Sequence, residues 1–156
     1  MTETAPNTEE LSELYLRDET AWLEEMAERI AAGAYDGLDY EHLREYLTDM
    51  AKRERREILS RLIVLIAHHL KWQYQPAGHS VSWQLTIAEQ RNLLSFEFDE
   101  SRVLQNHAED VLERAYTEAV KLASLETKLP KATFPKSSPL TAVAWVALPV
   151  PTDDGE

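Results

Sequence analysis

The chain has 156 residues, 4 glycines, no cysteine and a formal net charge of -12 at pH 7. This length fits one compact domain with its own hydrophobic core, and the lack of cysteine excludes a disulfide framework, a thiolate metal site and a cysteine nucleophile. The negative charge disfavours binding to nucleic acid or anionic lipid and favours basic partners.

The first predicted helix runs towards Gly33, which is placed to end it. Asn7-Thr-Glu-Glu10 resembles a capping box at its start. Asp18 is a competing N-cap, so the sequence leaves open where ordered helix begins. Apolar side chains recur at helical spacing: Leu11, Leu14, Tyr15, Trp22, Met26 and Ile30.

A long second helix is expected after the short turn 34–38, with Asp39 as its N-cap. No proline interrupts it before Pro76. The polar interval 51–57 leaves open whether this helix is continuous or kinked. Its apolar face consists of Leu43, Leu47, Met50, Ile58, Leu62, Leu65, His69 and Trp72.

Two further helices are predicted after the turn 75–79. Ser80 or Ser82 caps the third helix, which presents Trp83, Ile87 and Leu94 on one side. Residues 96–101 are expected to form a connector, and the fourth helix runs from about Ser101 to Thr127. Its stripe contains alanines that permit close helix packing: Leu104, Ala108, Val111, Ala115, Ala119 and Leu122.

The composition changes after Leu129, where prolines recur among large apolar residues. Prolines exclude a long helix there, so we expect a tail over residues 130–151 that packs across the helices, with one short helix near 141–147. Residues 152–156 should fray. The predicted fold is a single all-α domain over 1–156, with a core over about 8–129. Its architecture is an antiparallel up-down bundle of about four helices with a packed Pro-rich tail.

The end of the second helix is the first place to look for chemistry, because polar residues follow the apolar run Leu62–Ala67 there. Buried polar groups need partners or a cleft. His68 and Lys71 are therefore weak candidates for acid–base catalysis. In the alternative interpretation one of His68 and His69 points inward and is hydrogen-bonded, the other points outward, and Lys71 reaches water over Trp72.

Metal binding has little support in the sequence. Two pairs place a histidine and an aspartate three residues apart, Asp39 with His42 and His107 with Asp110. Such pairs arise by chance on acidic helices, so we assign no metal site, and no motif points to a cofactor.

The segment 52–61 is locally basic, although Glu54 and Glu57 lie within it. We expect a solvated helix face with i,i+4 ion pairs. Nucleic-acid binding through this segment is the weaker alternative.

Several blocks resemble the bacterial "domain of unknown function 29" family. They are Tyr15-x-x-Asp18-x-x-x-Trp22-Leu23, Leu38-Asp39 with Leu43 and Glu45, Ala67-His68-His69-Leu70-Lys71-Trp72-Gln73-Tyr74-Gln75-Pro76 and Ser82-Trp83. The resemblance implies a small helical fold and no established activity. Two positions depart from the family pattern: Tyr46 stands where a second glutamate is expected, and His69 replaces the usual leucine.

The family pattern adds polar candidates for a ligand site or a buried network: Asp18, Glu45, His68, Lys71, Gln73, Arg91 and Glu126. Trp22, Trp72 and Trp83 join them as aromatic candidates. Up-down connectivity predicts that Arg91 reaches the middle of the second helix and that Trp83 meets Trp72. Along a straight helix Glu45 lies over about 30 Å from His68, so those two residues cannot share one site.

The leading hypothesis is a non-catalytic cytoplasmic protein-interaction or regulatory module that binds another protein or itself. The alternative is a small enzyme or ligand-binding site around His68, Lys71 and Trp72. Cytoplasmic location follows from the absence of cysteine and from an acidic start unlike a secretory signal. The longest apolar run is far short of the roughly 20 residues that cross a bilayer, so we expect no membrane partner.

Overall fold

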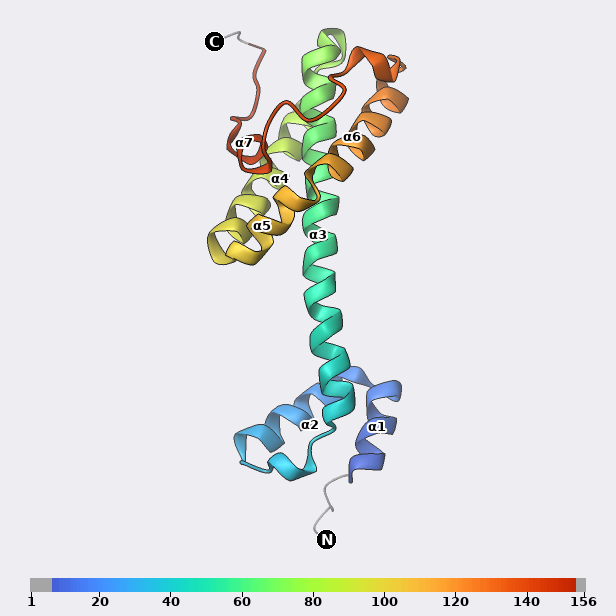
Figure 1. Cartoon of the computed structure of the whole chain (residues 1–156), viewed down its shortest axis with the longest axis vertical. Coiled ribbons are helices and arrows are strands. Elements are labelled where there is room, and N and C mark those ends of the chain that lie inside the picture. The colour runs from blue at the N-terminus through green and yellow to red at the C-terminus, as the bar shows by residue number, and fades with distance from the viewer. Residues whose placement is uncertain (1–6, 154–156) are drawn as a thin grey trace. The chain divides into compact units, whose positions relative to one another are not determined.

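The computed structural model describes residues 7–153, and all regular secondary structure within that range is helical. The α-helices are α1 (Thr8–Arg17), α2 (Glu19–Ala31), α3 (Tyr40–Tyr74), α4 (Val81–Glu100), α5 (Arg102–Asp110), α6 (Leu112–Thr127) and α7 (Ala142–Ala147) (Figure 1). Short 3₁₀-helices are η1 (Tyr35–Gly37), η2 (Pro76–Gly78) and η3 (Lys131–Thr133). The predicted all-α class is confirmed. No helix of this described part is long and apolar enough to cross a bilayer.

Backbone contacts divide the chain into two compact units after Lys52. Unit 1 contains α1, α2, η1 and the first turns of α3, and unit 2 contains the remainder of α3 and everything after it. Helix α3 is one element of 35 residues, so it is not split at the polar interval 51–57. The single-domain expectation stays a prediction, which a single cooperative unfolding transition would support.

In unit 1 the first predicted helix is divided into α1 and α2. The capping box is present: the Glu10 N–H donates to Asn7 Oδ1 at 2.9 Å, and the Asn7 N–H donates to Glu10 Oε2 at 3.1 Å. The division falls at Asp18, whose Oδ1 accepts from the Ala21 N–H at 3.1 Å. Asp18 therefore caps a second helix, because an N-cap residue adopts a non-helical conformation. The core of this unit consists of Leu11, Trp22, Met26 and Leu38.

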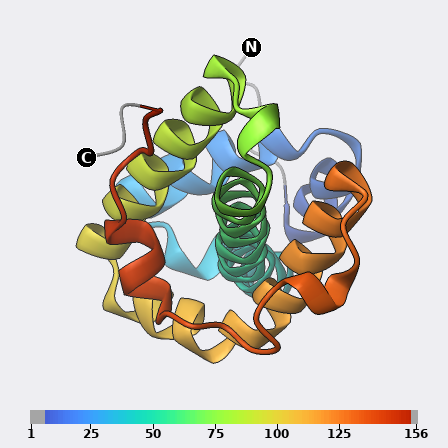
Figure 2. The same ribbon diagram turned by 90° about the horizontal axis from the view of Figure 1, so that it is seen from above.

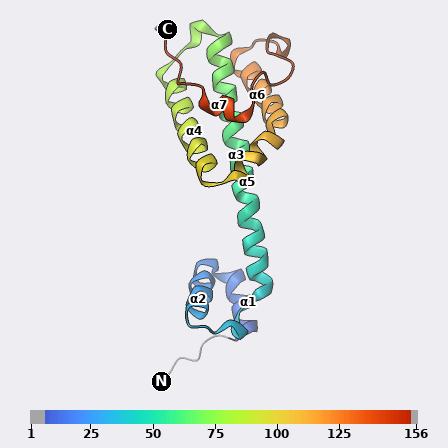
Figure 3. The same ribbon diagram turned by 60° about the vertical axis from the view of Figure 1, so that its left-hand side comes forward.

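In unit 2 the helices α4, α5, α6 and α7 lie around the C-terminal part of α3 (Figures 2 and 3). Their shared core includes Leu62, Leu65 and Leu70 of α3, Ile87 and Leu94 of α4, Ala115 and Ala119 of α6, and Trp145 of α7. The alanines lie at 0% exposure, as their predicted role in close packing requires.

Two predicted boundaries in unit 2 are wrong. Residues 96–100 continue α4 instead of forming a connector, and Phe98 packs against the core. The predicted fourth helix is divided at Val111, which has φ -98° and ψ 4°. Ser101 Oγ accepts from the Leu104 N–H at 3.1 Å and so caps α5, as an N-cap serine does. The described residues thus form seven α-helices where about four were predicted.

The proline-rich tail supplies part of the unit 2 core. Phe134, Trp145 and Val146 are buried in the same cluster as α3, α4 and α6. Helix α7 matches the short helix predicted near 141–147, and Trp145 Nε1 donates to Ser138 Oγ at 2.9 Å. Asp153 pairs with His79, so the predicted frayed end does not include that residue; residues 154–156 lie outside the described range.

Candidate functional site

Lys71 is the centre of a polar cluster at the C-terminal end of α3. Its side chain is 3% exposed, and its Nζ pairs with Glu126 Oε2 of α6. The ammonium group also lies 3.4 Å from His68 Nε2 and 5.0 Å from the centroid of the Trp83 ring of α4. We call Lys71, His68, Glu126 and Trp83 the Lys71 cluster. The expectation that Lys71 reaches water over Trp72 is wrong, because the ion pair and the Trp83 ring hold it inside.

The surroundings of His68 favour its neutral form. Burial is the main cause that lowers its pKa, and the charge of Lys71 adds to it, against opposing effects of the Val64 carbonyl and Glu126. Nδ1 lies 2.8 Å from the Val64 carbonyl, so that nitrogen carries the proton and donates. Nε2 is then the acceptor for the Lys71 ammonium group. The polar atoms of His68 and Lys71 are thus engaged by the fold itself.

His79 is the residue that sequence reasoning missed. Its ring stacks on Trp72 with centroids 3.7 Å apart and lies 6.2 Å from the Trp83 ring. Nε2 donates to the Trp72 carbonyl at 2.7 Å, and Nδ1 faces the Asp153 carboxylate, which raises the pKa of His79. His79 thus contacts both tryptophan rings, whereas the predicted direct meeting of Trp72 with Trp83 stays a prediction. The sequence feature that could have identified His79 is its position directly after Pro76-Ala-Gly78, because that turn folds the chain back over α3.

His69 and Arg91 form a second buried feature of unit 2. His69 is 4% exposed, and its Nε2 has no hydrogen-bond partner among the described residues. Burial, with the charges of His68 and Arg91, lowers the pKa of His69 to about 4. The predicted hydrogen bonding of the inward histidine is therefore wrong at Nε2. Arg91 Nε likewise has no hydrogen-bond partner within residues 7–153, and the predicted reach of Arg91 to the middle of the second helix stays a prediction.

Unit 1 contains a separate polar centre around Asp39, which is 2% exposed. Its Oδ2 accepts from Trp22 Nε1 and Ser12 Oγ at 3.3 Å each, and from His42 Nδ1 at 2.8 Å. Burial alone would raise the pKa of Asp39, but the hydrogen bonds from His42 and Trp22 outweigh burial and lower it. Asp39 also caps α3 as predicted, through the His42 N–H at 3.3 Å.

Some of the candidate site residues predicted from the sequence are buried, and others are exposed to solvent. Trp22 is buried in unit 1, where Asp18 is an exposed helix cap and Glu45 is exposed. In unit 2, Gln73 is exposed next to the buried Lys71 and Trp72. The structure therefore brings together only part of the predicted set, namely His68, Lys71, Trp83 and Glu126, with Trp72 joined through His79.

No group of three or more histidine, aspartate and glutamate side chains that could hold a metal is present in the described part of the chain. Asp39 and His42 meet in a direct hydrogen bond. In the basic segment Arg61 pairs with Glu57, an i,i+4 pair of the kind predicted, and its Nη1 lies 3.4 Å from Gln90 Oε1. Arg53, Arg55 and Arg56 are exposed.

The fold and the polar clusters define a small all-α protein in which the most unusual polar side chains tie helices together. The chain belongs to the family described as "Domain of unknown function DUF29", which matches residues 14–147. The resemblance found in the sequence is thereby confirmed. No curated protein and no solved structure matches the chain.

Proposed function

We propose that this protein is a non-catalytic cytoplasmic interaction module that binds a basic amphipathic helix of another protein along α4. The observation that carries the proposal is a stripe of exposed apolar side chains on that helix. Val81 is 68% exposed, Leu85 65%, Phe96 62% and Leu93 36%. We call these four residues the α4 stripe.

The α4 stripe lies on one side of the helix. At 3.6 residues per turn its members fall within about 120° of arc, while the core residues Ile87 and Leu94 lie on the opposite side. Burial of a large apolar side chain contributes about 1.5–3 kcal/mol, so a partner helix has enough apolar surface to bind. In this proposal α3, α4 and the α5–α6 pair act as an antiparallel bundle, covered by the tail, that keeps the stripe rigid.

Charge indicates the kind of partner. Glu89 and Glu100 are exposed and follow Leu85 and Phe96 by four residues, which places each carboxylate beside an apolar member of the stripe. The chain as a whole carries a net charge of -12. A partner helix with leucines on one face and lysines or arginines at its edges complements both features.

The Lys71 cluster supports a non-catalytic role. A general acid or base needs a proton that it can exchange with a substrate. Here the Lys71 ammonium group is shared between Glu126 and His68 under the Trp83 ring, and His68 donates to the main chain. These contacts join α3, α4 and α6, so they act to stabilise the fold.

The test uses a fluorescein-labelled synthetic helix of leucine and lysine, and the same peptide with glutamate in place of lysine. Fluorescence anisotropy should show that the full chain binds only the basic peptide. The double variant Leu85→Glu, Phe96→Glu should weaken binding at least about tenfold. The matched control is Leu16→Glu, Leu125→Glu, which adds the same charge at residues 79% and 77% exposed and should bind like the wild type.

Two outcomes of the peptide titration would overturn the proposal. One is equal affinity for the basic and acidic peptides, and the other is equal loss in the two double variants. A concentration-dependent dimer that Leu85→Glu, Phe96→Glu abolishes, without any peptide binding, would assign the stripe to a second copy of the chain instead.

A further inference from the structure

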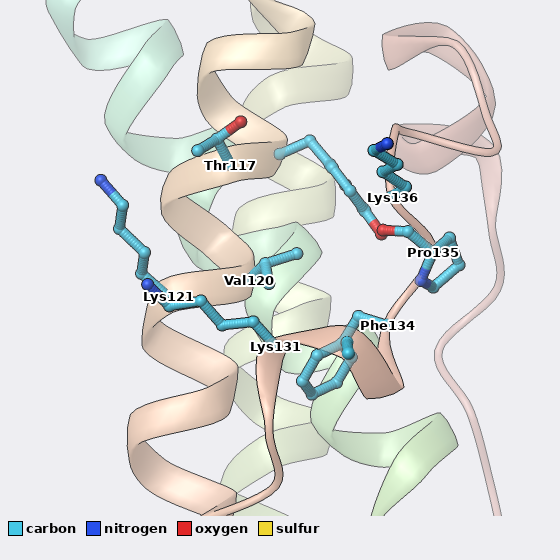
Figure 4. A pocket seen from close by; sticks show the side chains of 9 residues that line it. Thr117, Val120, Lys121, Lys131, Phe134, Pro135 and Lys136 are labelled. Atoms are coloured by element: carbon cyan, nitrogen blue, oxygen red, sulfur yellow. The ribbon is translucent and has the colours of Figure 1, made fainter.

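A pocket of about 490 Å³ opens between α6 and the segment that begins with η3 (Figure 4). Its apolar walls come from Val120 of α6, Ala132 of η3, and Phe134 and Pro135 after it. Phe134 is 4% exposed and belongs to the unit 2 core. The buried Tyr116 donates its hydroxyl to the Pro135 carbonyl, which ties the tail segment to α6. The pocket is therefore built by fixed parts of the fold.

Lysines border this pocket on both sides, with Lys121 and Lys131 on one side of the apolar wall and Lys136 on the other (Figure 4). None of the lining residues is acidic. Lys121 is 2.9 Å from Glu118 Oε1, but both side chains are about half exposed, so that pair is weak. The ammonium groups of Lys131 and Lys136 form no ion pair within residues 7–153.

The local charge is the reverse of that of the whole chain, which has 28 acidic and 16 basic residues. Exposed ammonium groups on both sides of the pocket attract an anion to its rim. The apolar wall between them favours a ligand that also has an apolar body. The volume lies within the range of about 300–1,000 Å³ that small-molecule sites occupy.

We propose that this pocket binds a small amphipathic organic anion. Its apolar body lies against Val120 and Phe134, and its acidic group pairs with a lysine at the rim, either Lys131 on one side of the apolar wall or Lys136 on the other. Lysine acts as a point charge with rotatable donors, so the acidic group is a carboxylate, sulfonate or phosphate without a preference for one geometry. The pocket and the α4 stripe share no residue, so each proposal can fail without the other.

The experiment titrates the full chain with 1-anilinonaphthalene-8-sulfonate and with N-phenyl-1-naphthylamine, which has the same rings without the sulfonate. Fluorescence should show one site that prefers the anion. Lys131→Gln, Lys136→Gln should weaken anion binding about tenfold and leave the affinity for the neutral probe unchanged. Decanoate should compete with the anionic probe, and the methyl resonances of Val120 should shift on its addition.

The matched control is Arg55→Gln, Arg56→Gln, which removes the same charge from exposed residues that do not line the pocket and should bind like the wild type. Three results would overturn the proposal: equal affinity for the two probes, equal weakening in both double variants, or unshifted Val120 methyl resonances at saturation. Loss of binding to phosphatidylglycerol vesicles in the Lys131/Lys136 variant, without any effect on the free anion, would assign the lysines to a membrane surface and also overturn it.

Discussion

Replacing His69 by leucine is expected to stabilise the protein at neutral pH. His69 is 4% exposed, and its Nε2 has no hydrogen-bond partner in the described part of the chain. An unsatisfied buried polar atom costs about 1–3 kcal/mol. The variant loses the ring contact with Trp145, whose centroid is 5.9 Å away, worth about 0.5–1.5 kcal/mol. We therefore expect a net gain of about 1 kcal/mol, or a Tm increase of about 2–4 °C.

The same substitution should remove a pH dependence. The folded pKa of His69 is about 4, below the usual histidine value of 6.5. For a pKa lowered on folding, the unfolded chain takes up a proton that the folded chain does not, so stability present above pH 6.5 is lost as the pH falls towards about 4. Between about pH 7.5 and about pH 4.5 this loss amounts to about 2.5 kcal/mol in the wild type. Leucine cannot take up a proton, so the variant lacks this loss.

Urea unfolding of both proteins at the two pH values measures these effects directly. The variant should exceed the wild type by about 1 kcal/mol at the higher pH and by about 3–4 kcal/mol at the lower. His107→Leu in α5 is the control for replacing a histidine by leucine elsewhere in the chain. A variant less stable than the wild type at about pH 7.5, or a gap that stays constant on acidification, would refute the reasoning.

Substitutions at four further residues test the polar clusters and one helix end by urea unfolding. Lys71→Met should change the free energy of unfolding by less than about 1 kcal/mol, because methionine removes the buried charge together with its desolvation cost. Glu126→Gln leaves that charge without its partner and should cost about 1–2 kcal/mol. A larger loss in Lys71→Met than in Glu126→Gln would contradict this. Asp39→Asn should lower the free energy of unfolding by about 2 kcal/mol at neutral pH. Because the folded pKa of Asp39 is lowered, the wild type loses the same stabilisation below pH 3.8, and the difference between the two proteins should shrink there. A difference that stays constant with pH would contradict this. Lys128→Gly should gain about 0.5 kcal/mol, because Lys128 has φ 63° at the end of α6, while Lys128→Ala should gain nothing.

The helical class and the course of α3 followed from the sequence because both depend on local signals. The spacing of apolar residues repeats over many turns, and prolines and glycines limit each helix. Helix boundaries at Asp18 and Val111 were harder to predict. Asp18 was recognised as a possible cap, but one side-chain hydrogen bond decides between a cap and a continuous helix, and such a bond depends on local backbone geometry. The sequence around Val111 contains neither proline nor glycine.

The position of the Lys71 cluster was predictable, but its role was not. An apolar helix that ends in histidine and lysine requires buried polar groups to find partners, and this argument needs no structure. Which partner each group finds depends on residues far away in the chain: Glu126 is 55 residues from Lys71, and Asp153 is 74 residues from His79.

The lysine pocket illustrates the same limit. Lys121, Lys131 and Lys136 form no recognisable pattern in the sequence. The bond from Tyr116 to Pro135 and the burial of Phe134 hold the segment with Lys131 and Lys136 next to α6, which carries Lys121. A residue type that is common on any surface borders an apolar pocket here because the tail folds back onto α6, so the proposed ligand site depends on contacts between segments that are distant in the sequence.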